Sequence, residues 1–185
     1  MRRGRQIALL VVCVLCMWCG SAFAGLRLVQ LDDNKSLADI IQSYNYLNRR
    51  MNSDDFAQEM RDHISESFIQ VDDQIVPYTK TYRTTNITTG TTIIACVNGN
   101  GYVSLMGVAV PISRSRAECV YTAAMLVQVI ASDLPYKDIQ GTCSNVMRTK
   151  EKGMVYSVKQ NRGYVIDTDS SDNGYVLWIY AMVNE

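Results

Sequence analysis

The chain has 185 residues, with 18 Lys plus Arg against 18 Asp plus Glu, so its formal net charge is zero. It contains no run of five like charges and no basic amphipathic helix. This pattern lacks the electrostatic footprint of a nucleic-acid-binding protein and gives no support for a membrane-surface role.

The N-terminal segment has the features of a secretory signal peptide. Arg2, Arg3 and Arg5 precede an apolar run over residues 7–18, and small residues close the segment at residues 21–24. The apolar run is about a dozen residues, shorter than the roughly 18 to 20 that a transmembrane helix needs.

We therefore expect residues 1–24 to be a cleaved signal peptide and residues 25–185 to form a single domain in the periplasm or outside the cell. The leader removes three Arg and no acid, which leaves 15 basic against 18 acidic residues, a net charge of −3. The processed domain is long enough to bury one core without help from a metal or cofactor.

Two amphipathic helices are predicted at the start of this domain. Ser36 caps the first, which carries an apolar stripe to Met51, and Ser53 caps the second, which continues to about residue 67. Together they predict an N-terminal helical layer.

Strands follow the helices. A period of two over residues 76–82 predicts a strand, and residues 91–97 and 102–110 predict a hairpin, because the Asn-Gly pairs between them supply the positive φ angles of a tight turn. The hairpin is the strongest local pattern in the chain.

A buried helix is predicted over residues 117–131. Ser115 and Glu118 form a capping box before an almost entirely apolar run, and Pro135 ends the helix. Residues 138–152 are expected to form a loop or a short helix.

The last part of the chain predicts a β-meander over residues 154–159, 164–168 and 175–183, because polar, turn-forming residues separate these three runs. The fold class is therefore α+β: an N-terminal helical layer, an antiparallel sheet with a β-hairpin, one buried central helix and the C-terminal meander.

Three cysteines remain after cleavage, and export places them where a disulfide persists. We expect a single bond between Cys119 and Cys143, because a helix carries the chain away from Cys119 and the following residues are long enough to return. Cys96, on an apolar central strand, is expected to be a buried inert thiol. No two of these three cysteines have C-x-x-C spacing, so no metal site is predicted.

Two further sites have simpler interpretations. His63, the only histidine, is a conceivable base for an unpaired cysteine, but no cysteine lies in a recognisable catalytic motif, which favours an exposed helix residue. Residues 167–173 begin like a calcium loop, but Asp172 stands where glycine is needed and Trp178 where glutamate is needed. A solvated turn with at most weak calcium binding is the better interpretation.

A candidate partner-binding edge follows Pro77, which cannot donate to a ladder. Neither face of this Thr-rich segment has a core pattern, so we expect an exposed edge strand that accepts a partner. The candidate residues are Tyr78, Thr79, Lys80, Thr81, Tyr82 and Arg83.

The sequence carries none of the common hydrolase, zinc-protease or phosphate-loop motifs. We expect an exported, non-enzymatic binding protein that acts as an adaptor, chaperone or inhibitor of an unknown protein or envelope component. It should need no cofactor, bind no nucleic acid and leave its processed chain outside the membrane. The alternative is a secreted hydrolase that uses a carboxylate pair, or a free cysteine with His63.

The leader gives a direct test. Cleavage is expected between Ala24 and Gly25, because small residues occupy the two positions that signal peptidase reads. N-terminal sequencing of exported protein checks the site. A mature chain that retains Trp18 would contradict the prediction.

Overall fold

The computed structural model describes residues 26–50, 64–86, 89–171 and 174–184. Eight antiparallel strands form one sheet in the order β2-β3-β4-β5-β8-β7-β6, and β1 pairs with β8 beside this path. The elements, in chain order, are β1 (Leu26–Val29), α2 (Leu37–Arg50), β2 (Ile69–Val71), β3 (Thr79–Thr85), β4 (Thr92–Asn98), β5 (Val103–Pro111), α3 (Arg116–Ile130), α4 (Tyr136–Thr149), β6 (Gly153–Ser157), β7 (Arg162–Ser171) and β8 (Gly174–Asn184).

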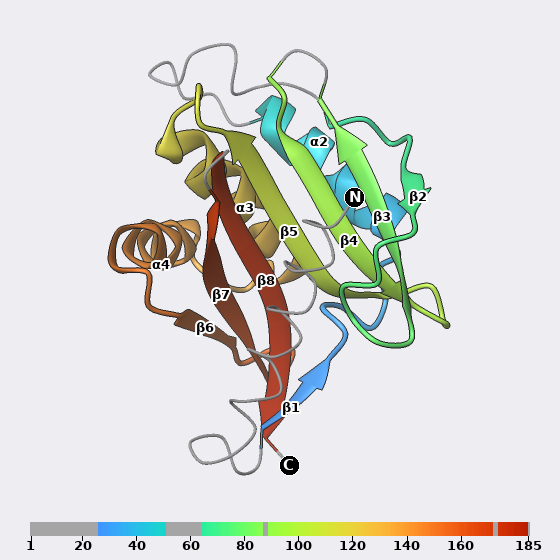
Figure 1. Ribbon diagram of the computed structural model, residues 1–185. Coiled ribbons are helices and arrows are strands. Elements are labelled where there is room, and N and C mark those ends of the chain that lie inside the picture. Colours follow the sequence, from blue (N-terminus) through green and yellow to red (C-terminus); the bar gives the residue numbers. More distant parts are fainter. Residues whose placement is uncertain (1–25, 51–63, 87–88, 172–173, 185) are drawn as a thin grey trace.

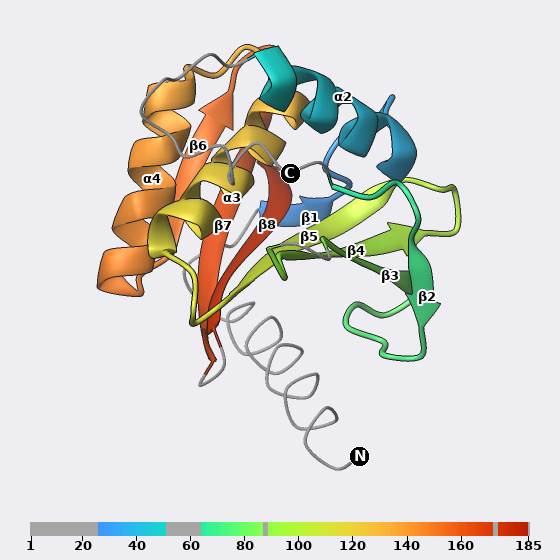
Figure 2. The ribbon, with the colours of Figure 1, turned by 90° about the horizontal axis from the view of Figure 1, so that it is seen from above.

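The helices of the described segments lie on one side of the sheet, with α3 between α2 and α4 (Figures 1 and 2). The predicted α+β class with an antiparallel sheet is therefore confirmed. The opposite side of the sheet carries no helix of the described segments, and we call it the helix-free face.

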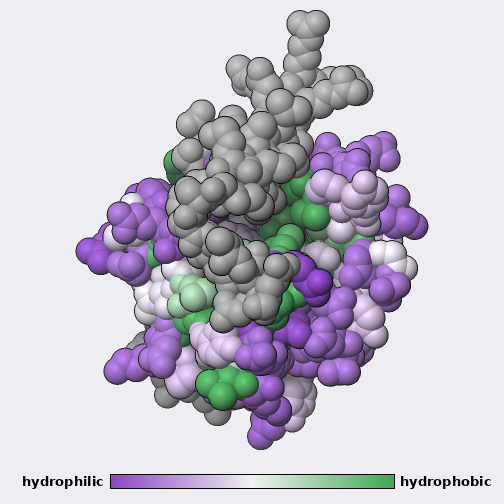
Figure 3. All heavy atoms as spheres, turned by 90° about the horizontal axis from the view of Figure 1, so that it is seen from below, coloured by the Kyte–Doolittle hydropathy of each residue, from purple (hydrophilic) through white to green (hydrophobic). Residues whose placement is uncertain are grey.

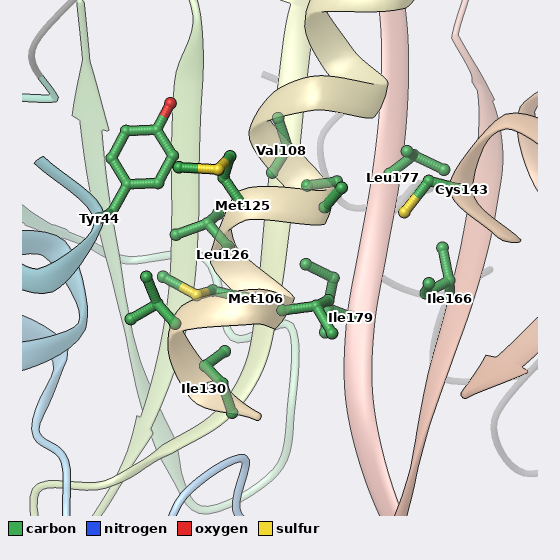
Figure 4. Close-up of a cluster of buried hydrophobic side chains, with 14 of the residues drawn as sticks. Tyr44, Met106, Val108, Met125, Leu126, Ile130, Cys143, Ile166, Leu177 and Ile179 are labelled. Carbon is green, nitrogen blue, oxygen red and sulfur yellow. The ribbon is translucent and has the colours of Figure 1, made fainter. Parts of the chain in front are cut away.

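The core is built around α3. Ser115 caps this helix by accepting a hydrogen bond from the backbone N–H of Glu118 at 3.4 Å, and 11 of its 15 residues are buried. A helix that is apolar on nearly all sides needs neighbours on all sides. Figure 4 shows Met125 and Leu126 of α3 among side chains from α2, β5 and β8.

The C-terminal end of α3 is closed by distant parts of the chain. The Lys35 ammonium donates to the carbonyl of Val129, and the Gln160 amide donates to the carbonyl of Ile130 at 2.7 Å. The last turn of α3 contains no basic residue of its own. Lys35 therefore supplies the positive charge that suits a helix C-terminus.

The end of the predicted helical layer differs in the structure, because the buried side-chain amide of Asn45 binds the main chain there. The Asn45 side chain donates to the carbonyl of Ile64 and accepts from its backbone N–H, both at 2.9 Å. Residues 64–67 are irregular rather than helical, so the predicted helix to residue 67 is wrong over these positions, because Asn45 takes both main-chain groups of Ile64. The rest of that helix lies outside the described residues.

The β4–β5 hairpin is confirmed. The N–H of Asn98 donates to the carbonyl of Tyr102 at 2.9 Å, and the N–H of Gly101 donates to the carbonyl of Asn98 at 3.0 Å. Gly101 has a φ of 86°, which glycine adopts without a steric penalty.

The region after α3 forms a full second helix. Where the sequence predicted a loop or short helix, α4 has 14 residues. Its buried residues Ile139, Cys143, Val146 and Met147 recur at helical spacing. The chain then forms β6, β7 and β8, which lie next to one another in the sheet.

Replacing Leu126 by Ala tests the central position of α3. Leu126 is 0% exposed, so the cavity should lower the free energy of unfolding by about 2–5 kcal/mol in urea titrations. The control is Lys137→Ala, an exposed position on α4, which should change it by less than about 0.5 kcal/mol. A small loss at Leu126 would contradict the packing described.

Candidate functional site

The predicted binding edge is not at the edge of the sheet. Residues 76–78 form a turn, the strand β3 begins at Thr79, and β3 lies between β2 and β4. β2 pairs with β3 through Ile69 opposite Arg83 and Val71 opposite Thr81. The edge assignment is therefore wrong for Thr81, Tyr82 and Arg83, because a short strand from outside the segment takes their ladder positions. Partner binding by the segment stays a prediction.

The six candidate residues differ in exposure. Thr81 is 2% exposed, and its Oγ1 lies 4.0 Å from the Cys96 Sγ. Tyr82 packs against the main core, and Thr79 is half-buried. Tyr78, Lys80 and Arg83 are exposed, and Tyr78 is 94% exposed in the turn that precedes β3.

Within the described segments, the two ends of the sheet path are β2 and β6. β6 is the longer of these two strands and pairs only with β7. Three exposed apolar residues lie on β6 or directly after it: Met154 at 54%, Tyr156 at 46% and Val158 at 82%. A strand with one unpaired edge and exposed apolar side chains is a template for a further strand.

Met154 and Tyr156 belong to the helix-free face. The Met154 side chain lies over Gly163 of β7, where an added Cβ would be 2.6 Å from the Met154 Sδ. Gly153, one residue earlier, faces Thr142 and Val146 of α4 instead. The alternation of a strand thus separates the two sides of β6.

The helix-free face has a cluster of its own around Cys96, Leu105 and Tyr180, with Trp178 packed beside them. The Trp178 ring lies flat on β5, because a Cβ on Gly107 would be 2.4 Å from its Cζ3. Trp178 keeps part of its surface exposed. Its Nε1 is buried, with no acceptor among the described residues.

Charged groups stand next to this ring. The Lys152 ammonium lies 2.8 Å from the Asp167 carboxylate and 3.3 Å from the hydroxyl of Tyr180. Burial alone would lower the pKa of Lys152, but the hydrogen bond from Lys152 to Asp167, with the nearby Tyr180, raises it overall. The result is a neutralised ion pair beside an aromatic platform.

The Lys152 contact also bears on the acidic loop. Asp167, the first residue of the loop that begins like a calcium site, is paired with Lys152, and its other oxygen accepts the backbone N–H of Thr168 at 2.9 Å. Residues 172–173 lie outside the described residues. Within the described part, no group of three His, Cys, Asp or Glu side chains is placed to hold a metal ion.

A carboxylate cluster surrounds Arg162 and Tyr164. The Arg162 guanidinium donates to the Gln30 carbonyl at 2.6 Å and to Asp33, while Asp133 accepts from the Ser157 hydroxyl at 2.8 Å. The Gln30 hydrogen bond and Arg162 hold the pKa of Asp33 below its usual value.

The pKa of Asp133 is also lowered. Burial raises the pKa of Asp133, but the hydrogen bonds from Ser157 and Lys159 outweigh it and lower the pKa overall. A general acid needs a raised pKa. These carboxylates therefore act as ion-pair and hydrogen-bond partners. Asp33 joins the chain before α2 to the start of β7, and Asp133 joins the α3–α4 connection to the β6–β7 turn.

The three cysteines of the described segments, Cys96, Cys119 and Cys143, are free thiols in the structure and are buried. Burial raises the pKa of Cys143 to about 12, and burial together with the nearby Cys143 raises the pKa of Cys119 to about 12. Protonated, enclosed thiols disfavour the cysteine nucleophile of the hydrolase alternative. His63 lies outside the described residues.

A groove on the helical side, of about 440 Å³, lies between α2 and the α3–α4 connection. Its lining includes Tyr46, Leu47, Val129 and Tyr136. Burial, with Tyr121 and Cys143 nearby, raises the pKa of Tyr136 to about 12. Among the residues that the structure describes, no charged side chain lines the groove, so these residues offer no ionic anchor.

Sequence reasoning missed the two sites on the helix-free face for different reasons. The alternation of Met154, Tyr156 and Val158 was visible as a strand, but pairing decides which strand is outermost. Trp178 and Asp167 stand opposite each other in β8 and β7. Only the register brings them together with Lys152.

No family model, curated protein or solved structure matches the chain. No helix in the described segments is long and apolar enough to cross a membrane.

The Cys119–Cys143 disulfide stays a prediction. Both residues belong to the main core, on the packed helices α3 and α4, and the bond would close a loop worth about 3 kcal/mol. Non-reducing peptide mapping of exported protein should show this link and one free thiol at Cys96. Three free thiols, or a link to Cys96, would be the contrary result.

Proposed function

We propose that the protein is an exported binding protein that acts as an adaptor, chaperone or inhibitor of an envelope or secreted partner, and that it engages this partner through β6. The observation that carries the proposal is that β6 ends the sheet path with one edge unpaired in the described segments, while Met154, Tyr156 and the following Val158 are exposed.

The backbone of β6 provides the attachment. A strand that pairs on one side only presents its remaining N–H and C=O groups to a newcomer. A partner segment in extended conformation satisfies these groups as a further strand of the sheet. This mode needs no catalytic group and no cofactor.

The side chains of β6 provide the selectivity. Met adapts to irregular apolar surfaces, and Tyr combines a large apolar body with a polar tip, which suits both residues to contact surfaces. The partner segment should therefore carry apolar residues at alternate positions, so that they pack on Met154 and Tyr156.

Figure 3 shows the molecule from the end at which β1 and β8 pair, where hydrophilic residues predominate and hydrophobic residues form smaller patches among them. A confined apolar surface among polar residues is the usual anatomy of a protein interface.

Photo-crosslinking in the producing cell tests the proposal. p-Benzoylphenylalanine at Tyr156 should yield an adduct of one defined mass with another protein. The matched control is Ile69, which is 72% exposed on the opposite edge strand β2 and should yield none. A further probe at Lys80 tests the originally predicted segment.

Substitution then ties the adduct to the apolar side chains. Met154→Ser with Val158→Ser should reduce the Tyr156 adduct at least about fivefold by removing apolar contact area, whereas Lys137→Ser should not. Equal adducts at Ile69, an adduct with a second copy of this chain, or no adduct at all would each contradict the proposal.

A further inference from the structure

The register of the sheet aligns a second set of side chains on the helix-free face. Arg83, Ile94, Gly107, Trp178 and Asp167 stand opposite one another across β3, β4, β5, β8 and β7. Directly opposed residues of antiparallel strands point to the same face. This row lies away from α2, α3 and α4, because the flanking Leu177 and Ile179 of β8 point to the helical core.

The centre of the row is a flat aromatic surface. Gly107 leaves the space above β5 that the Trp178 ring occupies, so the ring lies along the sheet instead of standing upright on it. A ring held in this way has one face against the backbone and turns the other outward, and Trp178 is partly exposed.

The polar groups beside the ring fit a neutral ligand. Lys152 and Asp167 neutralise each other at 2.8 Å, so this pair presents no net charge to an ion. The Asp167 carboxylate accepts from Lys152 at one oxygen and from the backbone N–H of Thr168 at the other, and each oxygen keeps a second acceptor position. A ligand rich in hydroxyl groups can donate to these positions.

From this arrangement we infer a carbohydrate-binding site in which a neutral pyranose ring stacks on Trp178 and its hydroxyls donate to Asp167, which Lys152 holds in place. The C–H face of such a ring is apolar and matches the aromatic surface, while its rim of hydroxyls matches the ion pair. A few convergent polar groups beside an apolar platform are typical of small-molecule sites.

The Trp178 N–H adds an independent observation. It is buried with no acceptor among the described residues, and an unmade hydrogen bond of this kind needs an explanation. A small rotation of the ring on binding lets a sugar oxygen accept from Nε1. The inference goes beyond the protein partner proposed for β6 and does not depend on it.

Titration of the exported protein with soluble trisaccharides tests the site. The probes are chitotriose, cellotriose and maltotriose, with sorbitol as an acyclic polyol control. At least one trisaccharide should shift the Trp178 fluorescence in a saturable way, and sorbitol should not. Trp178→Phe should remove the fluorescence change, which separates it from any signal of Trp18.

Calorimetry on variants assigns the contacts. Trp178→Leu should weaken binding at least about tenfold through loss of the stacked ring, and Asp167→Asn about tenfold through loss of a charged hydrogen bond. Tyr156→Ser, on the β6 surface, should leave sugar affinity unchanged, so the two proposals fail separately.

Thermal unfolding of each variant checks that it is folded. If Trp178→Leu does not fold, Asp167→Asn and Lys152→Met decide the outcome alone. Absence of binding to all three trisaccharides, saturable binding of sorbitol, or unchanged affinity in the folded Asp167→Asn variant would overturn the inference.

Discussion

The burial of α3 is the constraint on which the rest of the structure depends. Because this helix is apolar on almost every side, it cannot lie at the surface, and the sheet, α2 and α4 each cover part of it. The same need explains the contacts at its C-terminal end, where Lys35 and Gln160 reach the last carbonyls from distant segments. A single hydrophobic helix thereby fixes the positions of Lys35, just before α2, and of Gln160 in the β6–β7 turn.

Because the helices of the described segments lie on one side of the sheet, the described surface on the other side consists mainly of strand side chains. Two glycines shape that side: Gly163 accommodates Met154, and Gly107 accommodates the Trp178 ring. Both large side chains lie along the sheet because their neighbours lack a Cβ. The helix-free face therefore combines a low profile with aromatic and polarizable groups, properties that suit contact with a ligand or partner.

Local turns and helix caps could be predicted from the sequence, but the pairing between distant strands could not. The turn at Asn98 and the cap at Ser115 were predictable because each depends on a few adjacent residues. The position of β3 was not, because Ile69 and Val71 cover it from outside the segment. Buried threonines such as Thr81 made an interior strand look like an exposed one.

The helix α4 lies between these cases. Its spacing of Ile139, Cys143 and Val146 is helical, but Gly141 and a polar outer surface weakened the pattern. The candidate sites were the least predictable part. Met154 contacts a residue of the next strand, and Trp178 lies over Gly107, about 70 positions earlier in the chain, so only the register connects them.

The pairing of β1 with the end of β8 brings the two ends of the described chain together. Leu26 stands opposite Asn184 in this ladder, so the strands nearly close the polypeptide into a ring (Figure 1). A linker of a few residues is long enough to join these positions, since opposed Cα atoms lie about 5 Å apart. New ends opened in the exposed turn at Gly99 and Asn100 would leave every strand pair in place. The architecture is thus compatible with circular permutation, because the same strands can pair wherever the chain begins.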